Sequence, residues 1–252
     1  MGGAPERPLL EVRGAVKDFG GVRALAGVDL AVRAGARHAL IGPNGAGKTT
    51  LFHLLGGQLA PTRGRILLDG VDITSLPPEA RSRRGLARSF QIINCFPDAT
   101  ALENVQLALL ARHPARRAWW RPLNGASGVR AAAEALLRRL GLTEWAGHPA
   151  RQLPYGCQRR LDLAVALAGS PRLLLLDEPT AGLSPEETAE MVTLLNSLPR
   201  AQTLLVIEHD MDVVFRLAER VTVLAGGEIL ADGPPEAIRA DPAVQRAYFG
   251  GG

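Results

Sequence analysis

The fold is decided by one stretch of the sequence, which reads His38-Ala39-Leu40-Ile41-Gly42-Pro43-Asn44-Gly45-Ala46-Gly47-Lys48-Thr49-Thr50. Its opening residues, 38–41, are a short apolar run typical of a buried strand, and residues 49–57 are typical of a helix that ends at a glycine pair. Between them, residues 42–49 match the pattern G-x-x-x-x-G-K-[ST] at every fixed position. Because this turn follows a strand and opens a helix, it predicts a loop whose backbone N–H groups wrap phosphate oxygens.

The residues that close this loop carry its chemistry. Lys48 and Lys17 are the only lysines among 29 basic residues. Position 48 therefore keeps a lysine in a sequence that otherwise favours arginine. A compact ammonium fits among phosphate oxygens where a planar guanidinium would not. Thr49 is expected to ligate Mg²⁺ through its hydroxyl. The remaining residues expected to contact the nucleotide are Gly42, Pro43, Asn44, Gly45, Ala46, Gly47 and Thr50.

Two carboxylates follow a second apolar run, residues 173–176. Such a continuous run is typical of a strand buried on both faces, and α/β sheets bind ligands at the carboxyl ends of their strands. We predict that Asp177 holds Mg²⁺ through water and that Glu178 polarises the attacking water as general base. An acidic strand end is common by chance, so this prediction depends on the phosphate loop that precedes it.

The remaining pattern predicts an α/β fold with helices covering the sheet. Short β-type segments separated by glycine turns open the chain, the middle is helical from about Leu102 to Gly169, and apolar runs then return. The opening strands are expected at residues 9–12, 28–32 and 65–68, and the later ones at 173–176, 203–207 and 221–224. The sequence therefore predicts an antiparallel start, a parallel sheet and a helical insert between them.

Composition places few limits on function. The net charge of +4 admits nucleic acid or lipid as partners without selecting either. No apolar run approaches the roughly 20 residues that span a bilayer, and the first eight residues carry no secretory pattern, so we expect a cytosolic chain. Cys95 and Cys157 lack the spacing of metal ligands and are expected to be thiols.

Five further motifs occur along the chain, and their order resembles that of the ABC ATPase family. They correspond to that family's adenine-stacking aromatic, Q-loop, LSGGQ signature, D-loop and switch histidine. In chain order they are Phe19, Gln91 in Ser89-Phe90-Gln91, residues 153–157, residues 181–184, and His209 in Ile207-Glu208-His209-Asp210. The resemblance covers essentially the whole chain and implies that ATP and Mg²⁺ are bound.

The resemblance implies a role for each single residue. Gln91 would contact Mg²⁺ and the lytic water and sense the membrane partner, and His209 would contact the γ-phosphate. Alone, a glutamine after a strand is usually a surface residue and a histidine at a strand end is usually structural, so both roles depend on order and spacing. Phe19 would stack on adenine, with packing into the core as the alternative.

The implied architecture is a P-loop NTPase core of the RecA type, with an N-terminal antiparallel β subdomain and an inserted α-helical subdomain. One ABC ATPase domain would span residues 1–252. The nucleotide-binding core with the β subdomain is expected at about 1–100 and 170–252, and the helical signature subdomain at about 101–169.

The signature departs from the family pattern. Pro154 stands in place of the serine that meets the γ-phosphate bound by the opposite subunit, and Cys157 in place of the glutamine. Tyr155 and Gly156 still offer backbone N–H groups at a helix start, a geometry that favours an anion. Ser184 replaces an aspartate that is frequent in the D-loop. We therefore expect ATP binding more firmly than full-rate hydrolysis.

Several segments narrow the resemblance to the ATPases of branched-chain amino-acid (Liv-type) importers. These segments are residues 85–91, 96–98, 102–105, 153–156, 207–211, 241–242 and 246–250. The implied function is an ATP-hydrolysing importer subunit, for branched-chain or other hydrophobic amino acids, that couples ATP-driven dimer closure to permease subunits. ATPases of urea and amide importers share much of this pattern and are the alternative.

The implied partners are a second ABC ATPase subunit, identical or homologous, in a head-to-tail dimer, integral membrane permease subunits and, indirectly, a substrate-binding protein. Apolar residues 92–97 lie where the family forms a groove for a permease helix, with core packing as the alternative. The basic, aromatic stretch 113–130 around Trp119-Trp120 would face lipid, the permease or solvent. The chain is expected to be a peripheral subunit at the cytoplasmic face of the cell membrane.

Two rival functions belong to other classes. The first is an ABC ATPase that works on nucleic acid or ribosomes, which the absence of a second cassette and of a long charged coiled-coil insert opposes; we expect no nucleic-acid partner. The second is a scaffold that binds ATP with weak hydrolysis, suggested by Pro154 and Ser184. The presence of Glu178 and His209 argues against it.

Overall fold

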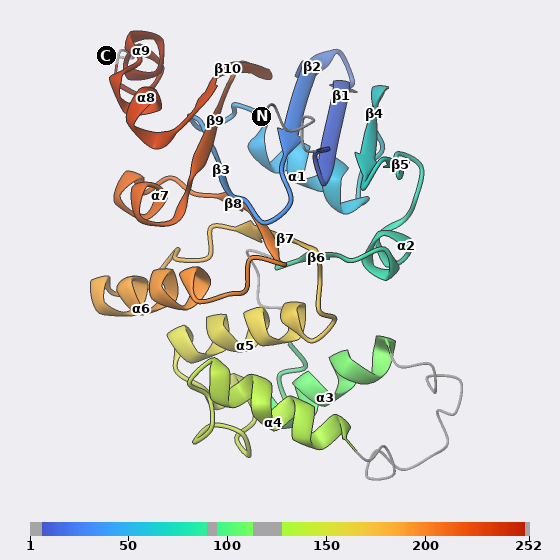
Figure 1. Ribbon diagram of the computed structural model, residues 1–252, viewed down its shortest axis with the longest axis vertical. Coiled ribbons are helices and arrows are strands. Elements are labelled where there is room, and N and C mark those ends of the chain that lie inside the picture. The colour runs from blue at the N-terminus through green and yellow to red at the C-terminus, as the bar shows by residue number, and fades with distance from the viewer. Residues whose placement is uncertain (1–6, 90–94, 113–127, 250–252) are drawn as a thin grey trace, which may run out of the picture.

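The computed structural model describes residues 7–89, 95–112 and 128–249, and Figure 1 shows sheets above a layer of helices. The strands are β1 (Leu10–Phe19), β2 (Val22–Val32), β3 (Arg37–Ile41), β4 (Arg63–Leu68), β5 (Val71–Asp72), β6 (Leu86–Arg88), β7 (Leu173–Asp177), β8 (Thr203–Ile207), β9 (Arg220–Ala225) and β10 (Glu228–Gly233). The helices are α1 (Lys48–Gly56), α2 (Pro78–Arg83), α3 (Ala101–Arg112), α4 (Val129–Arg139), the 3₁₀ turn η3 (Ala150–Gln152), α5 (Tyr155–Leu167), α6 (Pro185–Asn196), α7 (Met211–Leu217), α8 (Pro235–Ala240) and α9 (Pro242–Phe249).

Within these described ranges the strands form two sheets. One is antiparallel in the order β2-β1-β4-β5, and the other has the order β10-β9-β3-β8-β7-β6. From β9 to β6 the neighbouring strands of the second sheet are parallel, and β10 joins its edge antiparallel to β9. Every residue of β3, β7 and β8 is buried, as expected for central strands covered on both faces. The predicted α/β class is confirmed.

The first two strands are longer than the sequence predicts. β1 and β2 form one hairpin, with Phe19 paired to Val22, whereas the alternation of apolar residues predicts only two short strands. Register shifts between Val12 and Ala15 interrupt that alternation, and Gly14 between them has a φ of 55°. The bulge breaks the alternation of apolar residues, so the sequence pattern does not show that the strand is continuous.

The core consists of three aliphatic clusters. The first fills the space among the antiparallel sheet, α1 and one face of the parallel sheet, and it includes Phe52, the one buried aromatic side chain in the described core. The second lies on the opposite face of the parallel sheet, against α3, α4, α5 and α6. The third joins β3 and β9 to α7 and α8. The parallel sheet is thus covered on both faces, which leaves its strand ends for loops.

A buried arginine joins α2 to the helix that follows the phosphate loop. The Arg81 side chain is 1% exposed and donates to the carbonyls of Leu54 and Leu55 at 2.5 and 2.8 Å, near the end of α1. It also donates to the carbonyls of Thr74 and Leu76 at 2.9 and 2.8 Å. Burial lowers the pKa of this guanidinium to about 10. Arg81 therefore supplies donors to carbonyls in the last turn of α1, where intrahelical N–H groups run out; the carbonyl of Leu54 also accepts from the N–H of Gly57 at 3.3 Å.

We expect Arg81→Met to lower the free energy of unfolding by about 3 kcal/mol. Each buried carbonyl that loses its donor costs about 1–3 kcal/mol, and removal of a buried charge returns part of that cost. Urea unfolding followed by circular dichroism measures the change. Arg83→Met, an exposed position on the same helix, is the control and should shift the value by about 0.5 kcal/mol or less. Equal losses for both variants would refute the anchoring role of Arg81.

Candidate functional site

Three of the predicted site segments lie together at the carboxyl edge of the parallel sheet, whereas Phe19 lies on the antiparallel sheet and the signature residues begin α5. In the register of the strands, Leu40 pairs with Ile207, and Ile207 pairs with Asp177. The phosphate loop after β3, the acidic pair at the end of β7 and the segment after β8 are therefore neighbours. This is the edge at which α/β sheets bind their ligands.

The phosphate loop packs too closely against neighbouring strands to carry side chains at two of its glycines. A Cβ added at Gly42 would lie 2.1 Å from the carbonyl oxygen of Leu224, and one at Gly47 would lie 2.6 Å from that of Ala24. Gly47 also has a φ of 103° and precedes the first residue of α1. Only glycine fits both positions.

Lys48 lies across the loop. Its ammonium donates to the carbonyls of Gly42 and Pro43 at 2.5 and 2.9 Å. Burial lowers the pKa of Lys48, and the negative charges of Glu178 and Asp177 oppose that shift. The ammonium is thus directed toward the loop interior, with both predicted carboxylates close enough to act on it.

Asp177 is buried and is paired with an arginine that the sequence analysis did not select. Nη2 of Arg88 lies 3.0 Å from Oδ2 of Asp177, and the two side chains are 5% and 7% exposed. Arg88 ends β6, which is the neighbour of β7 in the sheet. Residues 85–91 resemble a segment of the family, and nothing in their pattern predicts this ion pair.

Glu178 and His209 face each other across the strand ends. Nδ1 of His209 lies 3.7 Å from Oε1 of Glu178, and the histidine side chain is 64% exposed. Glu178 has a φ of 47°, which is unusual for a residue with a side chain, and its N–H donates to the carbonyl of Ile207 at 3.0 Å. Such backbone costs about 1–3 kcal/mol and is found at functional sites.

Glu208 connects the loops that carry these two residues. Its side chain is 1% exposed. Oε1 accepts from the hydroxyl of Thr180 at 2.7 Å and from its N–H at 3.3 Å, while Oε2 accepts from the N–H of His209 at 3.2 Å. Burial raises the pKa of Glu208, and these hydrogen bonds oppose the shift. The sequence pattern singles out His209 and not Glu208, although an acidic residue directly after a buried strand is a signal for such a role.

The signature segment begins α5. Pro154 is the N-cap, and Tyr155 and Gly156 lie in the first turn, where N–H groups have no acceptor within the helix. The Tyr155 hydroxyl donates to the carbonyl of Ala181 at 3.2 Å, which joins the signature to the D-loop of the same chain. Gly156 is buried against α6, where a Cβ would lie 2.3 Å from Oε1 of Glu187.

Two replaced family residues have structural explanations. Ser184 is the N-cap of α6: its hydroxyl accepts from the N–H of Glu187 at 3.2 Å, and the Glu187 carboxylate accepts from the N–H of Ser184 at 3.0 Å. This capping box stabilises the helix start. Cys157 is buried in the helical cluster, and burial raises the pKa of its thiol.

Phe19 is 42% exposed at the β1–β2 hairpin, so it does not pack into the core. The Lys17 ammonium lies 5.0 Å from the centre of its ring and donates to the carbonyl of Ala60 at 2.9 Å. Gln91 and Trp119-Trp120, by contrast, lie outside the described residues, as do residues 92–94 of the expected permease groove. Phe96, at the end of that groove, is 63% exposed.

The donor set at the strand edge fits Mg²⁺. Thr49 supplies a hydroxyl in the first turn of α1, and Asp177 supplies a buried carboxylate at the end of β7. Mg²⁺ prefers such hard oxygen ligands and is usually held by one or two of them together with phosphates.

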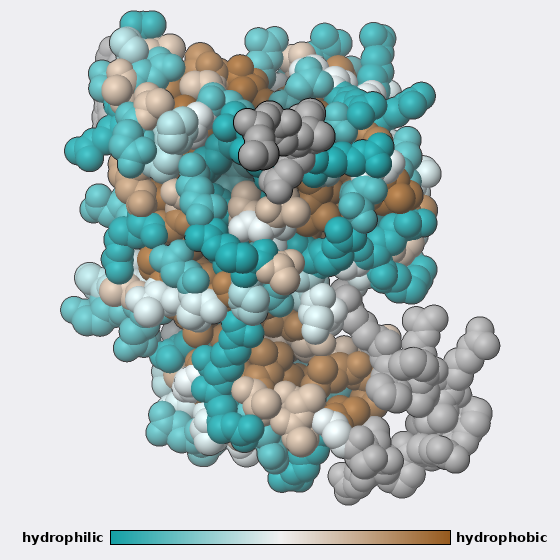
Figure 2. Space-filling view, in the orientation of Figure 1, coloured by the Kyte–Doolittle hydropathy of each residue, from teal (hydrophilic) through white to brown (hydrophobic). Residues whose placement is uncertain are grey.

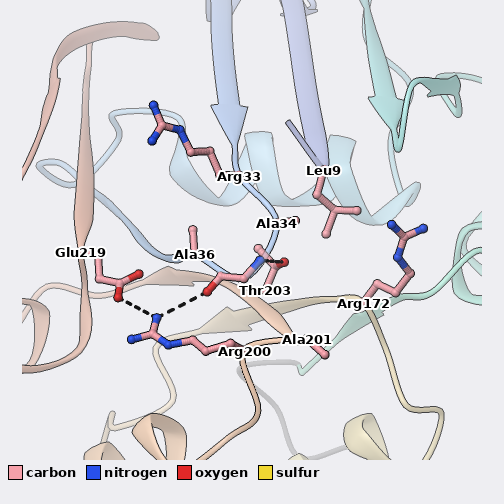
Figure 3. Close-up of a pocket in the computed structure, with 10 residues that line it drawn as sticks. Leu9, Arg33, Ala34, Ala36, Arg172, Arg200, Ala201, Thr203 and Glu219 are labelled. Atoms are coloured by element: carbon pink, nitrogen blue, oxygen red, sulfur yellow. Dashed lines mark hydrogen bonds and ion pairs between the residues drawn. The ribbon is translucent and has the colours of Figure 1, made fainter. Parts of the chain in front are cut away.

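A cavity of about 480 Å³ lies at the opposite edge of the sheet (Figure 3). It is bordered by the amino ends of β3, β7, β8 and β9, and includes Arg33, Arg172, Arg200 and Glu219. Arg200 pairs with Glu219 at 2.6 Å and Arg172 with Asp69 at 2.8 Å, so these two charges are already matched. The cavity is distinct from the phosphate loop.

The face seen in Figure 2 is largely hydrophilic, with hydrophobic side chains reaching the surface over the helical layer. Leu107 on α3 is among the exposed large apolar residues. No helix in the described ranges is long and apolar enough to cross a membrane.

Comparison with known proteins identifies similar sequences and folds. A family model described as ABC transporter matches residues 25–181, and one described as Branched-chain amino acid ATP-binding cassette transporter matches residues 228–252. The chain is 42% identical to the high-affinity branched-chain amino acid transport ATP-binding protein BraF of Pseudomonas aeruginosa, over 97% of this chain and 98% of that protein.

Solved structures match as well. A nucleotide-free ATP-binding cassette from an ABC transporter superposes with a TM-score of 0.85 at 28% identity, covering 96% of this chain and 99% of that one. A dimeric bacterial ABC transporter cassette superposes with a TM-score of 0.78 at 29% identity, covering 90% and 98%.

We expect the buried Glu208 to make stability depend on pH. Because its pKa is raised in the folded state above the ordinary 4.5, the folded protein takes up a proton that the unfolded chain does not. Relative to Glu208→Gln, the wild-type chain should therefore gain stability as pH falls from 8 toward 4.5, and lose it as pH rises through the folded pKa. Denaturant unfolding of both proteins across this range measures the difference.

Glu236→Gln, at an exposed glutamate of α8, is the control for the loss of one negative charge. A difference between wild type and Glu208→Gln that stays constant from pH 8 to 4.5 would contradict the raised pKa.

Proposed function

The chain belongs to the family of ABC transporter ATP-binding subunits and is an ATP-binding ATPase; on that premise we propose that it powers an importer for branched-chain amino acids. The observation that carries the substrate class is the match of residues 228–252 to the branched-chain cassette family, because this part lies outside the general ABC match at 25–181. The 42% identity to BraF over 97% of the chain supports the same class.

We assign the nucleotide contacts to the strand edge described above. The phosphate loop would hold the β- and γ-phosphates, with the Lys48 ammonium moving from the loop carbonyls to phosphate oxygens. Thr49 and Asp177 would hold Mg²⁺, which supplies positive charge to the phosphate oxygens when bound. Phe19 has an exposed ring that suits stacking on adenine, and Gln91 keeps its proposed contact with Mg²⁺ and the lytic water.

Glu178 is the proposed general base. Its carboxylate is partly exposed at the end of a buried strand, and His209 lies 3.7 Å away. A base must reach the proton that it removes, directly or through one water, and a neighbouring imidazole can hold both the base and the γ-phosphate in place. The hydrogen bonds that Glu208 accepts would hold the loops that carry Glu178 and His209 in fixed positions relative to each other.

The proposed active assembly is a head-to-tail dimer with a second cassette, identical or homologous. The similar cassette whose structure is dimeric supports a dimer of cassettes. The first-turn N–H groups of Tyr155 and Gly156 would face the γ-phosphate held by the partner subunit, and Pro154 would contribute shape without a donor. The bond from Tyr155 to Ala181 would couple the signature to the D-loop during closure.

We further propose that membrane permease subunits receive this motion and that a substrate-binding protein delivers the amino acid. The chain would then work at the cytoplasmic face of the cell membrane as a peripheral subunit. Urea or amide import is the alternative substrate class. The scaffold alternative loses one of its two supports, since Ser184 acts as the cap of α6.

We expect Glu178→Gln to keep ATP binding while lowering ATP turnover by about 10²–10⁴-fold, the contribution of a positioned general base. The variant should also accumulate an ATP-bound dimer, because hydrolysis no longer dissolves it. Phosphate release and analytical ultracentrifugation with ATP measure the two effects. Glu79→Gln, at an exposed position on α2, should leave both unchanged. Near-full turnover in Glu178→Gln would mean that another group activates the water.

The substrate class is tested by uptake. Cells from which this chain has been removed should lose most ATP-dependent uptake of labelled leucine, isoleucine and valine. The wild-type chain should restore this uptake and Glu178→Gln should not, since transport needs hydrolysis. Labelled urea and acetamide serve as the comparison: loss of their uptake with normal leucine uptake would replace the amino-acid proposal by the alternative.

A further inference from the structure

The ion pair between Arg88 and Asp177 occupies the carboxylate to which a metal role is assigned. Nη2 of Arg88 lies 3.0 Å from Oδ2 of Asp177, and neither side chain is more than 7% exposed. A carboxylate buried without a cation would be costly, so the guanidinium stabilises Asp177 when no metal is bound.

Arg88 lies between the two elements that carry the metal ligands. β6 pairs with β7 so that Arg88 is opposite Leu175, two residues before Asp177 on the same strand. On its other side, the guanidinium lies 5.8 Å from the ring centre of Phe52 on α1, the helix that also carries Thr49. Its Nη1 donates to Oε1 of Gln58 at 3.2 Å.

The backbone around Arg88 is fixed. The next residue, Ser89, donates its N–H to the carbonyl of Leu175 at 2.9 Å. Its hydroxyl also donates to the buried carboxylate of Asp162 on α5. The guanidinium is therefore presented to Asp177 by a backbone held on both sides, and a change of its partners requires side-chain movement alone.

We propose that Arg88 is a positioning residue that holds the Asp177 carboxylate in the absence of metal and lowers the affinity of the nucleotide site for Mg²⁺. A divalent cation and a guanidinium repel each other and compete for one carboxylate. When Mg²⁺ binds, Arg88 keeps its contacts with Gln58 and Phe52, so its charge does not become free. The inference rests on the proposed role of Asp177 toward Mg²⁺.

The test compares Arg88→Gln, Arg88→Lys and the wild type. ATP binding is measured by calorimetry at a series of free Mg²⁺ concentrations, without reference to turnover. In Arg88→Gln, the Mg²⁺ concentration that gives half of the maximal change in ATP affinity should fall about tenfold, which corresponds to about 1.4 kcal/mol. Arg88→Lys keeps the positive charge and should stay close to the wild type. Arg65→Gln, at an exposed arginine of β4, is the control.

A second measurement uses the nucleotide-free protein. Arg88→Gln leaves Asp177 without its cation, so its melting temperature should fall and Mg²⁺ alone should restore it, whereas Mg²⁺ alone should change the wild type little. Gln58→Glu offers a variant at an exposed position if Arg88→Gln fails to fold. Its new carboxylate would draw the guanidinium from Asp177 and should also lower the Mg²⁺ concentration required.

The outcomes separate this inference from the proposed function. If Mg²⁺ leaves ATP binding by the wild type unchanged, the proposed metal site is wrong. Suppose instead that Mg²⁺ changes ATP binding by the wild type. If it changes ATP binding by Arg88→Gln at the same Mg²⁺ concentration, Arg88 does not compete with the metal. The same conclusion holds for Gln58→Glu where it replaces Arg88→Gln. An equal shift in Arg88→Lys and Arg88→Gln would overturn the role of its charge.

Discussion

The close approach of the phosphate loop to the strands around it is the constraint on which the rest of the structure depends. Side chains at Gly42 or Gly47 would collide with carbonyl oxygens of β9 and β2, which belong to different sheets. The N–H of Gly227 donates to the carbonyl of Ala46 at 3.1 Å, and the N–H of Ala26 donates to the carbonyl of Gly227 at 2.9 Å. Both sheets therefore meet around the loop and the adjacent turn at Gly227, and this close approach fixes where α1 begins.

The buried carboxylates near this loop are stabilised in two different ways. Asp177 is paired with a guanidinium, whereas Glu208 accepts hydrogen bonds from a hydroxyl and two N–H groups. The first arrangement places a positive charge beside the carboxylate, and the second places only neutral donors beside it. A carboxylate held by neutral donors in a buried place is easier to protonate, which suits a structural bridge between loops. Burial alone does not decide what an acid in this site does.

The sequence predicts the parts of the site whose residues are close together in the chain. The phosphate loop, Asp177 and Glu178 follow local patterns, and the α/β class follows from the buried apolar runs. Arg88 and Asp177 are separated by 89 positions, and Thr180 and Glu208 by 28, so only the folded sheet brings each pair together. A glutamate three residues after Ser184 indicates a helix cap, whereas the family pattern, which has an aspartate at this position, does not.

The scarcity of lysine has a consequence for chemical modification. Of the side-chain amines in this sequence, Lys48 lies in the phosphate loop and Lys17 lies over the exposed ring of Phe19. Burial lowers the pKa of Lys48, and its ammonium donates to the carbonyls of Gly42 and Pro43. The side-chain amines available to an amine-directed label are therefore confined to the start of α1 and the β1–β2 hairpin, while the arginine-rich surface stays unmarked.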